Sequence, residues 1–132
     1  MAIELLCQAP MSIAVLLVEP DIQLRVSRAE AMTIAGYDVT TAATFEDGVA
    51  SIERDIPHVL VAAVRLGLFN GLHLVLKARA ASPSLAAVVT AAGDDVGLAP
   101  DAARHGAEFL IEPVSAATLV AAIARALPSA AS

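Results

Sequence analysis

The sequence has almost no aromatic residues and a single cysteine. Its 132 residues include no Trp, one Tyr and three Phe against 30 alanines, so a hydrophobic core must be built from alanine and aliphatic side chains. Because Cys7 is the only cysteine, an internal disulfide and a metal site of paired cysteines are both excluded. A hydrophobic fraction of 58% excludes intrinsic disorder and, at this length, is typical of one domain.

Basic residues are also scarce, with 8 Lys and Arg against 14 Asp and Glu and a net charge of −6. No basic cluster is present, so the attraction to phosphate that nucleic-acid binding needs is missing. The uncharged stretch 5–18 has 14 residues and contains Pro10, which falls short of the ~20 residues of a membrane span. The first basic residue, Arg25, comes too late for a secretory signal. We therefore expect a cytoplasmic protein that binds neither nucleic acid nor membrane.

Short apolar runs alternate with helical patterns, as strands and crossover helices do in a parallel sheet. The runs predict strands at residues 13–18, 37–41, 58–64, 85–90 and 108–112, with 58–64 at the centre. Helices are predicted at residues 21–35, from 44 to before Pro57, at 72–81, near Pro100 and at 115–127. The fourth is expected to be short or irregular because Gly93, Gly97 and Pro100 interrupt it. The predicted fold is a doubly wound, five-stranded parallel α/β sheet flanked by five helices.

Local signals place the helix starts and faces. Thr44, followed by Asp47, predicts one N-cap, and Ser115 predicts another. In the first helix, the apolar spacing predicts that the core face consists of Leu24, Ser27, Ala31 and Ile34.

The domain is expected to span residues 12–127, between an N-terminal extension (1–11) and a tail (128–132). Two alternatives remain for the extension: Met11 is the native start, or the segment is a short arm in which Leu5 and Leu6 cover an apolar surface.

Several segments, in order, carry a resemblance to a known family. They are VLLVEPD at 15–21, AGY at 35–37, HVLVAAVRL at 58–66 running into FNGL at 69–72, VVTA at 88–91 and GAEFLIEP at 106–113. Over residues 13–127 the sequence resembles the receiver domain of response regulators, the chemotaxis-regulator-like module of two-component signalling. The resemblance implies a flavodoxin-like fold.

The resemblance also implies a phosphotransfer site, which needs a nucleophilic Asp, acids that hold Mg²⁺, and a Lys and a hydroxyl that gather phosphoryl oxygens. It places the phosphoacceptor at Ala63 and the Lys at Glu112, so both groups are missing. Of the acidic pair after the first strand, Glu19 is kept, Pro20 replaces the second acid and Asp21 follows. We expect no phosphorylation at Ala63 and weak or absent Mg²⁺ binding, because at best two carboxylates remain.

Two positions keep the residue types that the resemblance implies. Thr90 matches the switch hydroxyl, and Phe109 matches the aromatic residue that couples the pocket to the outer face. Packing alone would equally select both residues, so their presence does not establish switching.

The resemblance brings Glu19 and Glu112 close together, where each raises the pKa of the other unless a cation intervenes. Arg65, on the loop after the third strand, is the nearest candidate cation. We therefore predict a Glu112–Arg65 ion pair.

Other catalytic chemistry finds little support. The histidines His58, His73 and His105 are dispersed and lack metal-ligand spacing. The turn after the first strand is not glycine-rich, and Asp94 and Asp95 are typical of a helix start or a solvent-facing loop. We do not expect an enzyme.

The sequence thus predicts an atypical receiver that acts without phosphorylation as a protein-interaction module. Its expected surface lies within residues 97–127, where a signalling protein, such as a histidine kinase or an effector, or a second copy would bind. The weak helix near Pro100 is expected to leave this face mobile until a partner binds. The alternative is a small-ligand or cation sensor that uses the vacated pocket around Glu19, Ala63, Thr90 and Glu112.

Overall fold

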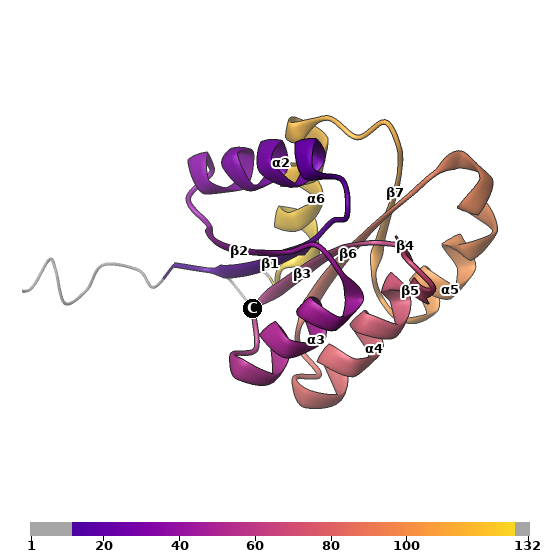
Figure 1. Cartoon of the computed structure of the whole chain (residues 1–132), viewed down its shortest axis with the longest axis horizontal. Helices are drawn as coiled ribbons and strands as arrows, with labels where there is room; N and C mark the ends of the chain where they lie inside the picture. The colour runs from indigo at the N-terminus through magenta and orange to yellow at the C-terminus, as the bar shows by residue number, and fades with distance from the viewer. Residues whose placement is uncertain (1–11, 129–132) are drawn as a thin grey trace, which may run out of the picture.

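The protein forms three layers, with one sheet between two layers of helices (Figure 1). The computed structural model describes residues 12–128, so the predicted extension, with its two alternatives, and the tail beyond Pro128 lie outside the described residues. Within this range the main sheet has five parallel strands in the order β2-β1-β3-β6-β7. They are β1 (Ala14–Val18), β2 (Asp38–Ala42), β3 (Val59–Ala63), β6 (Ala86–Ala91) and β7 (Glu108–Ile111). The predicted doubly wound sheet is confirmed, with β3 at its centre.

In the part of the chain that the structure describes, five α-helices cover the two faces of the sheet (Figure 1). One face carries α2 (Ile22–Ile34) and α6 (Ala116–Ala126), and the other carries α3 (Phe45–Arg54), α4 (Gly71–Ala81) and α5 (Ala99–Arg104). Alternate strand residues supply the two cores: in β1, Val15 and Leu17 pack toward α2 and α6, whereas Leu16 packs toward α3 and α4. Two aliphatic cores, as the composition predicts, hold the layers together.

The predicted helix signals are confirmed at three places. The Thr44 hydroxyl accepts the Asp47 N–H at 3.0 Å, and the Ser115 hydroxyl accepts the Thr118 N–H at 3.1 Å. The fourth helix, α5, has only six residues and follows a 3₁₀ segment, η1 (Gly93–Leu98). The loop after β3 contains a small antiparallel pair that the sequence did not predict, β4 (Arg65–Leu66) with β5 (Phe69–Asn70).

The predicted core face of α2 is wrong. Ile34 is 80% exposed and Leu24 is also exposed, whereas the buried residues of this helix are Arg28 and Met32. Residues four apart share a helix face, so burial of Met32 carries Arg28 inward. Apolar spacing misses this face because a buried arginine requires partners from other elements.

No helix within residues 12–128 is long and apolar enough to span a bilayer.

Candidate functional site

The carboxyl ends of the strands surround a pocket of about 610 Å³. This is the edge at which ligands bind in open α/β sheets. Five of the predicted site residues line it, namely Glu19, Asp21, Ala63, Thr90 and Glu112. Phe109 lies outside the pocket lining, half-buried on β7, and packs against the core under α3, α4 and α5.

Ala63 and Thr90 lie next to each other on two adjacent strands, β3 and β6. They pair in register between β3 and β6, and the Val64 N–H donates to the Thr90 carbonyl at 2.8 Å. Thr90 is buried, while Ala63 is half-buried at the pocket wall. The β3 position beside the Thr90 hydroxyl therefore presents only a methyl group.

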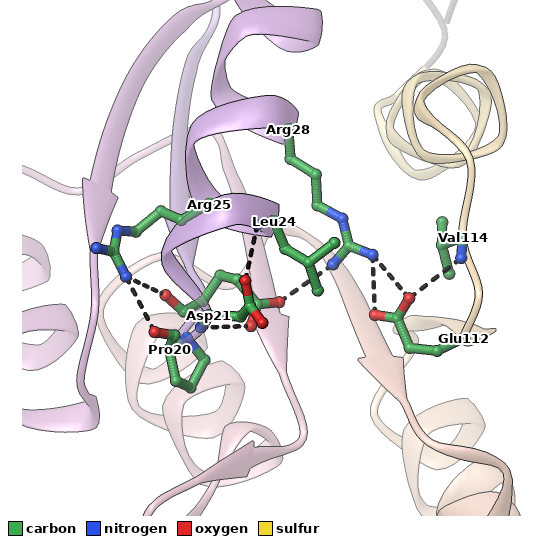
Figure 2. Close-up of polar contacts among 8 residues, drawn as sticks. Pro20, Asp21, Leu24, Arg25, Arg28, Glu112 and Val114 are labelled. Atoms are coloured by element: carbon green, nitrogen blue, oxygen red, sulfur yellow. Dashed lines mark hydrogen bonds and ion pairs between the residues drawn. The ribbon is translucent and has the colours of Figure 1, made fainter.

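The central charged group of the pocket edge is Arg28, a residue that sequence reasoning missed. Its Nη1 donates to Glu19 Oε1 at 3.1 Å, and its Nη2 donates to Glu112 Oε1 and Oε2 at 2.7 and 2.9 Å. Figure 2 shows the guanidinium spanning from one carboxylate to the other. The Arg28 side chain is only 4% exposed. We call these three residues the triad.

Backbone groups satisfy the remaining acceptors of the triad (Figure 2). Glu19 Oε2 accepts the Asp21 N–H, and Glu112 Oε1 accepts the Val114 N–H, each at 3.1 Å. Among the described residues, every buried side-chain nitrogen or oxygen has a hydrogen-bond partner. Both carboxylates of the triad are therefore held by donors from the protein itself.

Burial raises the pKa of the Glu19 carboxyl above its usual value. The hydrogen bond from the Asp21 amide and the charge of Arg28 oppose this rise in pKa, while the charges of Glu112 and Asp21 add to it. Desolvation dominates because the carboxylate lies at the sheet edge beneath α2, where little water reaches it.

The predicted Glu112–Arg65 ion pair is wrong. Arg65 Nε and Nη2 donate to the two carboxylate oxygens of Asp95, both at 2.8 Å, and Asp94 lies 3.6 Å from the guanidinium. The hydrogen bond to Asp95 and the charges of both acids raise the pKa of Arg65. Because β4 directs Arg65 toward η1, the cation between Glu19 and Glu112 comes from α2 instead.

One signal for Arg28 was available in the sequence. Two acids that follow strands of the same parallel sheet, at the same edge and without the lysine that the resemblance leads one to expect, require a cation nearby. The first helix offers Arg25 and Arg28. Arg25 caps the backbone, donating to the Glu19 and Pro20 carbonyls at 2.8 and 3.2 Å, so it is the buried Arg28 that joins the acids.

The donor set does not fit Mg²⁺, the metal that the resemblance implies. Mg²⁺ demands near-octahedral oxygen coordination. Both oxygens of Glu19 are already hydrogen-bonded, Asp21 caps α2 by accepting the Leu24 N–H at 3.0 Å, and Ala63 has no side-chain oxygen. Within residues 12–128, no three His, Cys, Asp or Glu side chains gather as ligands would. The cation-sensor alternative loses its basis for the same reason, because Arg28 already binds both of the acids on which it depended.

Comparison with known proteins gives a consistent picture, although no family model matches the chain. It is 27% identical over 114 residues to the C4-dicarboxylate transport transcriptional regulatory protein DctD of Rhizobium meliloti, covering 86% of this chain and 25% of that protein. It is 32% identical over 93 residues to the alginate biosynthesis transcriptional regulatory protein AlgB of Pseudomonas aeruginosa, covering 70% and 21%. The chain spans a quarter or less of the length of these relatives.

Solved structures share the fold along nearly their whole length. The response regulator receiver domain protein of Clostridium thermocellum has a TM-score of 0.81 at 21% identity, covering 87% of this chain and 94% of that one. The chemotaxis response regulator CheY4 of Vibrio cholerae has a TM-score of 0.80 at 22% identity, covering 89% and 100%. The receiver domain of NtrX from Brucella abortus has a TM-score of 0.78 at 25% identity, covering 86% and 97%.

Proposed function

Since the chain is a response-regulator receiver domain of the CheY-like type, we propose that it acts without phosphorylation, as a protein-interaction module of two-component signalling. The observation that carries this proposal is the methyl group of Ala63 at the β3 position paired with Thr90. A methyl group has no lone pair with which to attack phosphorus. Receiver domains interact with kinases and effectors, and the contact proposed here is one that the surface of the domain makes without a phosphorylated aspartate.

The charges around Ala63 support the same proposal. A phosphoryl group carries about two negative charges and needs cations to bind. In this pocket Glu112 lies where the resemblance places a lysine, and Arg28 and Arg65 are already paired with carboxylates. An incoming phosphoryl group would have to displace an internal carboxylate before it met a free cation.

The surface that we propose for partner binding is the α5–β7–α6 face, within the predicted residues 97–127. It combines an exposed apolar residue, Ile111, with two exposed ion pairs, Arg104–Asp101 at 3.0 Å and Arg125–Glu108 at 3.1 Å. Protein interfaces contain both apolar and charged side chains. The six-residue α5 is too short to be stable as a helix alone, so its order depends on what packs against it.

The test of phosphorylation independence is an amide NMR titration with Mg²⁺ and beryllofluoride, a phosphoryl mimic that needs an aspartate acceptor. We expect no saturable shifts at Ala63, Thr90 or Phe109. Mg²⁺ with fluoride alone is the matched blank, and a receiver that keeps its aspartate is the positive control. Saturable shifts that spread from the strand ends to Phe109 would contradict the proposal, because they would mean that Glu19, Asp21 or another acid has rebuilt the site.

Sedimentation velocity over a range of concentrations separates the two kinds of partner. A mass that rises with concentration in the wild type and not in Ile111→Asp identifies a second copy bound through the face. A monomer at all concentrations assigns the face to a different signalling protein.

A further inference from the structure

We propose that the Glu19–Arg28–Glu112 triad is a latch that holds the connection between β7 and α6 in one arrangement without phosphorylation. Through this connection it would fix the shape of the α5–β7–α6 face. The importance of that face rests on the proposed function, whereas the latch itself rests on the contacts of the triad.

The triad is poorly explained as a source of stability. Moving charges from water into a protein interior costs several kcal/mol per ion, and a buried ion pair often does no better than apolar residues of the same size. Arg28 and Glu19 are both buried, and the triad carries two carboxylates for one guanidinium. What such a group supplies instead is position, because its hydrogen bonds fix direction and distance.

The contacts of Glu112 show which segment is positioned. Its carboxylate is held from α2 by Arg28 and in turn holds the Val114 N–H, two residues further along the chain. Ser115, the N-cap of α6, follows immediately. Only four residues separate the end of β7 from the start of α6, so this carboxylate pins the connection and sets where α6 begins relative to α2 (Figure 2).

The triad joins three segments, the end of β1, α2 and the end of β7, of which the last lies far from the other two in the sequence. Arg28 and Glu112 are 84 residues apart in the sequence, and Glu19 follows β1, which is not a neighbour of β7 in the sheet. In Figure 1, α2 and α6 cover the same face of the sheet, where the two helices contact each other. The Arg28–Glu112 contact ties α2 to the segment that precedes α6. The position of α6, and of the surface that it carries, therefore depends on Arg28 of α2.

The test measures hydrogen exchange on the free, unphosphorylated protein. The main variant carries Arg28→Met, Glu19→Gln and Glu112→Gln together, which removes all three charges and keeps side-chain length. Because all three charges are removed together, no unpaired charge is left in the interior, so this variant should fold. The matched control is Glu108→Gln, the same change on β7, where it breaks the exposed pair with Arg125.

In the triple variant we expect amide exchange at residues 112–118 to rise at least about tenfold, because the charge-assisted hydrogen bonds that attach residue 112 to Arg28 are lost and the Val114 N–H keeps only a neutral acceptor. Exchange in β1, β3 and β6 and the urea midpoint should stay near the wild type. The Glu108→Gln control should leave residues 112–118 unchanged. If the triple variant is too unstable, Glu112→Met alone, which keeps the Arg28–Glu19 pair and removes the acceptor of the Val114 N–H, should produce the same local rise.

Two results would overturn the latch. Unchanged protection at residues 112–118 would show that the triad does not hold the connection. A uniform rise over the whole sheet would show a purely structural role. Neither result depends on beryllofluoride or on a partner, so failure of the latch and failure of the proposed function are distinguishable.

Discussion

Replacing Gly71 with alanine should destabilise the protein and disturb the β3 end of the site. Gly71 is the buried first residue of α4, and its N–H donates to the Val64 carbonyl at 2.8 Å. A Cβ at this position would overlap the Ala63 carbonyl oxygen and approach the Ala63 carbonyl carbon to 3.0 Å. These are backbone atoms at the end of the central strand, so they cannot turn aside as a flexible side chain would.

The expected loss follows from two opposing effects. Overpacking a close contact costs about 1–3 kcal/mol. Alanine favours helix over glycine by up to about 1 kcal/mol, which offsets part of this cost. A net loss of about 1–2 kcal/mol in the free energy of unfolding should lower the melting temperature by roughly 3–10 °C for a domain of this size.

Urea and thermal unfolding of Gly71→Ala and Gly97→Ala provide the measurement. At Gly97, in η1, an added Cβ would have no atom within 4 Å and φ is not positive, so this position controls for the loss of a glycine. The amide shifts of Ala63 and Thr90 should move in Gly71→Ala and not in Gly97→Ala. If the two variants are equally stable, the close approach of α4 to β3 does not require glycine, and the reasoning fails.

Two further predictions concern the triad. Arg28→Met leaves two carboxylates without their cation at a buried site, so it should lower the free energy of unfolding by about 3–5 kcal/mol. Arg125→Met breaks only the exposed pair with Glu108 and should lower it by less than about 1 kcal/mol. If urea unfolding gave the same loss of stability for Arg28→Met and Arg125→Met, burial of the ion pair would not explain its importance. Because burial raises the pKa of Glu19 in the folded state, the stability of the wild type relative to Glu19→Gln should be greatest at about pH 4 and fall toward pH 7. A relative stability that rises over this range would contradict the dominance of desolvation.

Much of the fold could be predicted because its signals are local. Apolar runs marked the strands, and Thr44 and Ser115 marked helix starts through hydrogen bonds that span only three residues. The resemblance added the site positions, and the structure gathers Glu19, Asp21, Ala63, Thr90 and Glu112 around one pocket because parallel strands end at the same edge. That residue 63 is an alanine, where the resemblance places the phosphoacceptor, was also visible in the sequence alone.

The charge partners could not be read in the same way. The order of strands and helices follows from residue types and short spacings. Tertiary structure decides which face of α2 is buried and therefore that Arg28 lies inside. It also decides that Arg28 pairs with Glu112 and that Arg65 pairs with Asp95, because these partners lie far apart in the sequence. A buried guanidinium is tolerated only where carboxylates surround it. Here those carboxylates come from residues 9 and 84 positions away, so folding itself had to bring them together.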